Sequence, residues 1–140
     1  MASYQISCGI YTRNVNSMRL YVLEGGKATH TLHEVELTLF NRSTCNQPSW
    51  YANFLTENMI CAGDPDGGRG TCTGDSGGPL ACVDKSLKTW RIYGLTSWAK
   101  VPCAGPDSPT VFTRVSAFVS WINSNIEKRT DNLTLHRLLR

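Results

Sequence analysis

The stretch RGTCTGDSGGPLAC, residues 69–82, holds a serine inside the glycine-rich hexamer GDSGGP. Glycine tolerates positive φ and has no Cβ, so Gly74 and Gly77 favour a sharp turn that pushes Ser76 outward. Such a turn also aims the N–H groups of Gly74 and Ser76 at one point. Two convergent donors are what the oxyanion of a tetrahedral intermediate needs. These residues therefore predict a nucleophilic serine beside an oxyanion hole.

The alternative interpretation is an ordinary glycine-rich turn whose serine has no chemical role. GDSG alone would favour that alternative. The complete hexamer between Cys72 and Cys82 favours the nucleophile, because a motif gains specificity from its structural context. Asp75 lies within the same turn. If its carboxylate is buried, it must find a cationic partner or shift its pKa.

A serine hydroxyl is a poor nucleophile until a base takes its proton, and this chain has three histidines. They are expected on a loop, at the start of a strand and in the C-terminal tail: His30, His33 and His136. None is expected to serve as the base for Ser76. HTLH, residues 30–33, is compatible with a pair of metal ligands, but solvated histidines at a strand edge are the favoured interpretation. No metal or organic cofactor is expected.

Short strand-like segments separated by turn residues must position this motif. HEVELTLF, residues 33–40, alternates strictly, with Val35, Leu37 and Leu39 on one face, which predicts a half-buried strand. Further strands are expected at RLYVL (19–23), NMICAG (58–63), GPLACV (78–83), WRIYGLTSW (90–98) and TVFTRV (110–115). Regular short strands with Gly and Pro turns predict an all-β barrel or sandwich.

One helix is expected near the C-terminus, with Ser116 as its N-cap. An apolar stripe at helical period is formed by Phe118, Val119, Ile122 and Ile126. Residues 129–140 are expected to form a frayed tail rather than a membrane or partner helix, because their few leucines cover too little area.

Length and composition limit the classes of function. A chain of 140 residues fits one domain, and its net charge of +3, from 14 basic and 11 acidic residues, gives no basic patch for nucleic acid. No apolar run is long enough to span a membrane. Six cysteines without a C-x-x-C pair indicate an oxidising compartment rather than zinc binding. N-x-S/T triplets at Asn41 and Asn132 fit a secretory route, yet MASYQISCGIYTRN does not look like a signal peptide.

Four stretches carry a resemblance to the chymotrypsin-fold (trypsin-like) serine proteases: RGTCTGDSGGPLAC, TLHEVELTLFNRSTCN, NMICAGD and PTVFTRVSAFVSWIN. The likeness runs from about Gly26 to Ile126. It implies the C-terminal six-stranded antiparallel barrel of the two-barrel fold, followed by a C-terminal α-helix. The implied organisation is an atypical segment 1–24, a barrel domain 25–128 and a tail 129–140. The last stretch is closest to the pancreatic elastase and chymotrypsin C branch.

The resemblance implies a role for each matching residue. Ser76 corresponds to the catalytic nucleophile, with Gly74 and Ser76 as the oxyanion hole. The specificity pocket corresponds to Gly70, Ala99 and Thr110, and the strand that pairs with the substrate backbone corresponds to Ser97, Trp98 and Ala99. The implied disulfides are Cys45–Cys61 and Cys72–Cys103, with Cys8 as the candidate partner of Cys82.

Gly70 lies where trypsin-like members carry the aspartate that binds Lys or Arg. A neutral base rejects a cation, because an unpaired buried charge is costly. Ala99 and Thr110 replace wall glycines and narrow the slot. We therefore expect an elastase-like preference for a small or medium apolar residue before the cleaved bond. An aromatic residue before the cleaved bond is the alternative, since one or two extra methyl groups in a pocket discriminate only weakly between substrates.

The family's catalytic histidine and aspartate precede everything that matches here, and the TAAHC motif is absent. The family's cleaved N-terminus, whose ammonium pairs with the residue equivalent to Asp75, is absent as well. The first hypothesis is a secreted serine endopeptidase present as its C-terminal half and inactive alone. The second is a non-catalytic homologue that binds a protein. Expected partners are protein or peptide substrates, protease inhibitors and a missing N-terminal barrel.

Overall fold

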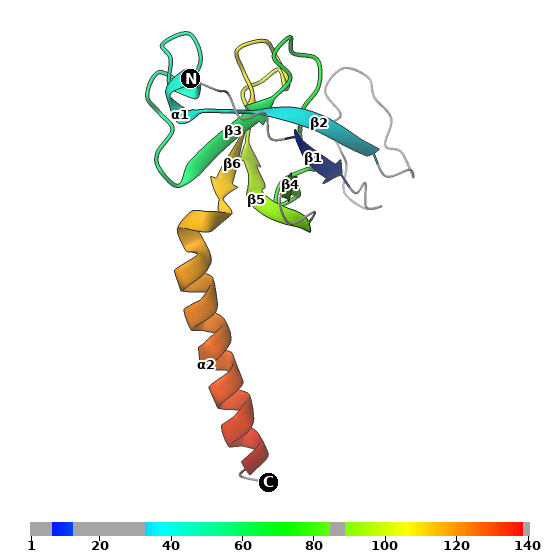
Figure 1. Ribbon diagram of the computed structural model, residues 1–140. Helices are drawn as coiled ribbons and strands as arrows, with labels where there is room; N and C mark the ends of the chain where they lie inside the picture. The colour runs from blue at the N-terminus through cyan, green and yellow to red at the C-terminus, as the bar shows by residue number, and fades with distance from the viewer. Residues whose placement is uncertain (1–6, 13–32, 85–88, 139–140) are drawn as a thin grey trace.

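The computed structural model describes residues 7–12, 33–84 and 89–138, and within these residues six antiparallel strands close into a barrel (Figure 1). The strands are β1 (Ser7–Thr12), β2 (His33–Phe40), β3 (Met59–Gly63), β4 (Pro79–Asp84), β5 (Thr89–Trp98) and β6 (Thr110–Arg114). Their order around the barrel is β1-β2-β3-β6-β5-β4, and pairing of β1 with β4 closes it. The predicted all-β barrel is confirmed.

Strand β2 shows why alternation predicts a half-buried strand. Leu37 is buried, and Val35 and Leu39 pack against the same core cluster. Glu34 and Glu36, on the other face, are exposed. Successive side chains of a strand point to opposite faces, so one apolar face meets the core and one polar face meets water.

Two core clusters lie on opposite faces of β3 and β6. One contains Leu37, Ala62, Leu80, Cys82 and Phe112, and the other contains Cys45, Tyr51, Leu55, Cys61 and Val111. Neighbouring residues of a strand thus serve different clusters, as the period of two requires. The second cluster anchors the loop that follows the short helix α1 (Arg42–Cys45), and the Cys45–Cys61 disulfide ties this helix to β3.

The barrel begins earlier in the chain than expected. Strand β1 falls inside segment 1–24, which the sequence places outside the barrel, yet it pairs with both β2 and β4. Its six residues, SCGIYT, are too few to show a decisive alternation, so the long-range pairing defines the strand. The expected strand at residues 19–23 lies outside the described residues.

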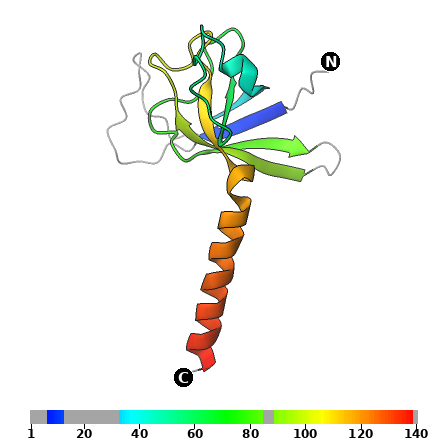
Figure 2. The same ribbon diagram turned by 90° about the vertical axis from the view of Figure 1, so that its left-hand side faces the viewer.

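The C-terminal helix also differs from the expectation. A 3-10 helix (Val115–Phe118) precedes α2 (Val119–Leu138), so Ser116 lies inside the first helical turn and the N-cap is Arg114. Residues 129–138, expected to fray, continue α2. Figures 1 and 2 show α2 projecting away from the barrel. Among the described residues, no helix has the length and apolar content needed to cross a membrane.

The predicted apolar stripe of this helix is present in the sequence but does not enter the core. Phe118, Val119 and Ile126 are exposed, and so is Trp121. A helical stripe is buried only where another element faces it, and Figure 2 shows α2 projecting away from the barrel.

Candidate active site

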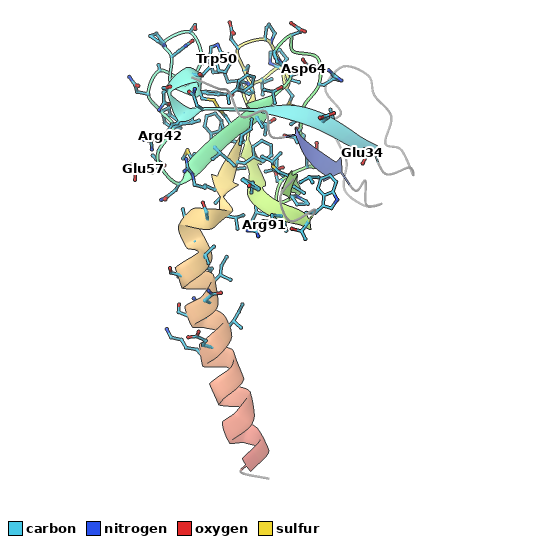
Figure 3. The ribbon with its side chains drawn as sticks, viewed as in Figure 1. Glu34, Arg42, Trp50, Glu57, Asp64 and Arg91 are labelled. Atoms are coloured by element: carbon cyan, nitrogen blue, oxygen red, sulfur yellow. A yellow bond between two sulfur atoms is a disulfide. The ribbon has the colours of Figure 1, made fainter. Side chains whose placement is uncertain are left out.

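Three loops gather at the end of the barrel that faces away from α2 (Figure 1). They follow α1, β3 and β5, and they carry the disulfide Cys72–Cys103 and the hexamer around Ser76. Figure 3 places Trp50 and Asp64 among these loops. The predicted site residues that come from distant parts of the chain therefore lie at one end of the fold.

The turn that carries Ser76 has the backbone that its glycines predict. Gly74 has φ 101° and Gly77 has φ 78°, both in the region that L side chains rarely adopt. A Cβ on Gly78 would lie 2.9 Å from the carbonyl oxygen of Asp75, so close approach requires glycine there. Ser76 is exposed, as the outward turn predicts.

Hydrogen bonds attach this turn to β5. The Gly77 N–H donates to the Thr96 carbonyl at 2.8 Å, and the Thr96 N–H donates to the Gly78 carbonyl at 2.9 Å. The Thr96 hydroxyl donates to the same Gly78 oxygen at 3.1 Å. The turn is thereby held on the strand that continues into Ser97 and Trp98.

Asp75 is half-buried behind Ser76, and its carboxylate accepts a hydrogen bond from the Cys72 N–H at 2.9 Å. Burial raises the pKa of this carboxyl group, and the Cys72 hydrogen bond offsets part of that effect. The ion pairs between described side chains are Arg42–Glu57 and Arg69–Asp64, and neither involves Asp75. Within the described residues, burial without a cationic partner therefore favours the neutral form of Asp75.

The predicted pocket residues Gly70 and Thr110 are neighbours. A Cβ built on Gly70 would lie 3.6 Å from the Thr110 hydroxyl oxygen and 3.0 Å from the Cβ of Ala104. Thr110 is buried and accepts a hydrogen bond from the Thr71 hydroxyl at 2.8 Å. The atoms nearest to a Cβ on Gly70 thus belong to Ala104 and Thr110, and neither of these residues is charged.

Sequence reasoning missed Thr71 and Ala104. Both flank predicted features: Thr71 follows Gly70, and Ala104 follows Cys103. The Cys72–Cys103 disulfide joins these two loops, and the Gly68 N–H donates to the Ala104 carbonyl at 2.7 Å. The expected disulfide was therefore the signal that could have placed Ala104 beside Gly70.

The segment Ser97–Ala99 combines a bulge with an aromatic contact. The pairing of β5 with β6 shifts register between Thr96 and Trp98, which leaves Ser97 as the extra, exposed residue. Trp98 packs edge-on against Tyr51, with ring centroids 5.1 Å apart, and against Phe54 at 5.6 Å. Ala99 follows directly and is half-buried.

Burial raises the pKa of Tyr51, whose hydroxyl donates to the Pro109 carbonyl. This bond ties the loop after α1 to the residue that precedes Thr110. Lys100, the residue after Ala99, lies over the Tyr51 ring with its Nζ 4.8 Å from the centroid. The loops that flank the predicted pocket are thus tied to one another by side chains as well as by disulfides.

The remaining predicted residues are placed by the backbone. Register sets Cys8 directly opposite Cys82, and Cys82 is disulfide-bonded. His33 begins β2 and His136 lies near the end of α2, while His30 is outside the described residues. Within the described part of the chain, no group of three or more His, Cys, Asp or Glu residues is placed to hold a metal ion.

The fold and this turn define a class, the serine proteases of the trypsin type, and comparison with known proteins agrees. The family model described as Trypsin matches residues 21–122, so the chain belongs to the trypsin family. It is similar to Transmembrane protease serine 5 of Homo sapiens, with 41% identity over 96 residues. That alignment covers 69% of this chain and 20% of the relative, so the chain spans about a fifth of that protein's length.

Proposed function

We propose that this chain is the nucleophile-bearing half of a serine endopeptidase. Ser76 is the nucleophile, and the N–H groups of Gly74 and Ser76 form the oxyanion hole. The observation that carries this proposal is the turn itself: Ser76 is exposed between two glycines with positive φ, on a loop bonded to β5. Membership of the trypsin family supports the role of this turn in nucleophilic attack and in oxyanion binding.

The proposed substrate preference is elastase-like, for a small or medium apolar residue before the cleaved bond. It is supported by the absence of a charge at Gly70 and by the closeness of Ala104 and Thr110 to that residue. An arginine or lysine side chain would lose its hydration there without gaining a counter-ion. The exposed backbone around Ser97, with Trp98 and Ala99, is the proposed edge for antiparallel pairing with the substrate.

Catalysis requires a histidine base and an aspartate that orients it, and we propose that both come from an N-terminal barrel, with the isolated chain inactive. Removing the histidine from such a triad removes most of its rate. Protein or peptide substrates and protein protease inhibitors are the proposed partners. An extracellular location is proposed because the cysteines are disulfide-bonded, a state typical of oxidising compartments.

The alternative is a non-catalytic protein that acts by binding. Two observations favour it: the half-buried Asp75 has no ion pair within the described residues, and several large apolar side chains are exposed. The exposed set includes Trp90 and Ile92 on β5 and Trp121 on α2. Exposed apolar patches of this kind mark protein interfaces.

A chimera separates the two functions. The N-terminal barrel of an elastase-type member of the family is fused ahead of Gly26, and hydrolysis of p-nitroanilides ending in Ala, Val, Phe or Arg is followed. We expect hydrolysis after Ala and Val, little after Arg, and none in a Ser76→Ala chimera. If a folded chimera hydrolyses none of the four p-nitroanilides, the result favours the alternative, a non-catalytic protein that acts by binding. Efficient cleavage after Arg contradicts the proposed specificity.

A further inference from the structure

Two adjoining hollows lie where α2 leaves the barrel, on the side of the fold away from the Ser76 loops. One, of about 540 Å³, has an apolar lining that includes Met59, Ile60, Ile92, Tyr93 and Val119. The second, of about 560 Å³, is lined mainly by polar groups. Arg42, Arg114 and Ser116 line both hollows. The region thus combines an apolar hollow with a polar one, and Arg42 and Arg114 contribute to the lining of both.

The charge of this region is strongly one-sided. Among the described residues, three arginines and no acidic side chain line the apolar hollow: Arg42, Arg91 and Arg114. Glu57 is the acidic residue of the polar hollow, and it pairs with Arg42 at 3.6 Å across an exposed surface. Figure 3 shows Arg42 with Glu57 on one side of the barrel and Arg91 closer to the start of the helix. Glu57 offsets one of the three arginine charges, so the described lining of the two hollows keeps a net positive charge.

Arg114 supplies the most specific signal. One of its terminal nitrogens donates to the Met59 carbonyl at 3.3 Å, which leaves most of the guanidinium donors for other acceptors. Its Nε is buried and has no hydrogen-bond partner among the described residues. A buried charged donor without an acceptor is costly, and native proteins rarely leave one so. Arg114 lines both hollows, so an anion there would accept hydrogen bonds from the donors of its terminal nitrogens.

We propose that these hollows bind a single-chain anionic amphiphile, such as a medium-chain fatty carboxylate. The anionic head lies against Arg114 and Arg42, where Asn58 and Ser116 offer further donors. The hydrocarbon chain lies in the apolar hollow against Ile60, Ile92 and Val119. A volume of about 540 Å³ lies within the range of small-molecule sites, and the excess of arginines over acidic side chains in the described lining matches an anionic head.

Calorimetric titration of the disulfide-bonded 140-residue chain with sodium decanoate, below its micelle-forming concentration, tests the site. We expect saturable binding of one decanoate per chain, weakened by added salt. Decyltrimethylammonium has the same alkyl chain with the opposite charge and is expected to show no saturable binding. Glu57→Gln, which removes the acidic side chain, is expected to tighten decanoate binding.

Two variants keep the test independent of folding defects. Arg114→Gln is expected to raise the decanoate Kd about tenfold or more, because a charge-assisted bond is lost. Val119→Glu puts a carboxylate on an exposed residue of the apolar hollow and is expected to abolish binding with thermal unfolding unchanged. Lys128→Gln removes a positive charge from α2 outside both hollows and is the matched control, with Kd unchanged.

Equal binding of the cationic amphiphile, or full decanoate binding by Val119→Glu, would overturn the proposal. So would binding of the chain to phosphatidylglycerol vesicles without binding of free decanoate, because the ligand would then be a membrane surface. If sedimentation shows a dimer that Val119→Glu dissociates, the occupant is a second copy of the chain and the proposal is wrong.

Discussion

The two ends of this barrel differ in how firmly their segments are held in place. At the Ser76 end, a disulfide, backbone hydrogen bonds and glycines in special conformations hold the loops together. At the other end, α2 leaves the barrel with Phe118, Val119 and Trp121 exposed. The contrast is between a site end held together by contacts within this chain and a helix whose Phe118, Val119 and Trp121 side chains are exposed.

The largest expected effect is a difference in the free energy of unfolding between a variant in the barrel core and a variant on α2. Phe112→Ala removes a fully buried ring and is expected to lower the free energy of unfolding by about 3–5 kcal/mol. Trp121→Ala removes an aromatic side chain that is 66% exposed and is expected to change it by about 0.5 kcal/mol or less. Urea unfolding followed by circular dichroism measures both. Equal losses would show that the helix stripe is packed in solution.

The second prediction concerns the stability contributed by the Cys72–Cys103 disulfide, which joins two loops at the Ser76 end of the barrel. Cys72→Ser with Cys103→Ser removes a disulfide that closes a sequence separation of 31 residues, and we expect a loss of about 3 kcal/mol. Val101→Ser, an exposed change inside the same segment, is the control and should be near neutral. If the double variant unfolds at the wild-type urea concentration, the disulfide does not hold these loops.

Gly77 offers a smaller and more local test. Its φ of 78° strains any L side chain although nothing lies within 4 Å of a new Cβ, so Gly77→Ala is expected to cost about 1–2 kcal/mol. Gly77→Asn should recover part of that loss, because asparagine visits this conformation more readily than alanine. An alanine variant as stable as the wild type would contradict the described turn.

The smallest effect concerns the pH dependence contributed by Asp75. Its pKa in the folded chain lies above the ordinary value of 3.8, so the unfolded carboxyl group ionises first. Its contribution to stability is therefore fully present below that value and is lost as the pH rises through the folded pKa. Relative to wild type, Asp75→Asn should gain stability over that interval in urea titrations at stepped pH. A constant difference between the two proteins would show that the carboxyl group is not buried.

The sequence predicted the local features of this molecule better than its long-range ones. The turn around Ser76 and the alternation of β2 follow from residue types alone, because glycine conformation and the period of two are local properties. The disulfides Cys45–Cys61 and Cys72–Cys103 came from family resemblance and are confirmed. The composition of a six-cysteine chain leaves many pairings open.

Three features depended on contacts that residue types do not reveal. Strand β1 is defined by pairing with β2 and β4 across long stretches of chain. The contact of Ala104 with the space above Gly70 requires two loops to be folded against each other. The sequence predicted an apolar stripe on the helix, but periodicity states only that such a face exists and does not supply an element that covers it.

Fluorophosphonate labelling of Ser76 tests the half-site account most directly. The disulfide-bonded chain and its fusion to an N-terminal barrel are compared by mass spectrometry, with Ser76→Ala as the control in each. We predict rapid, stoichiometric modification of Ser76 in the fusion and little in the isolated chain, because the base is supplied only in the fusion. Rapid labelling of the isolated chain, or none in a folded fusion, would contradict the account.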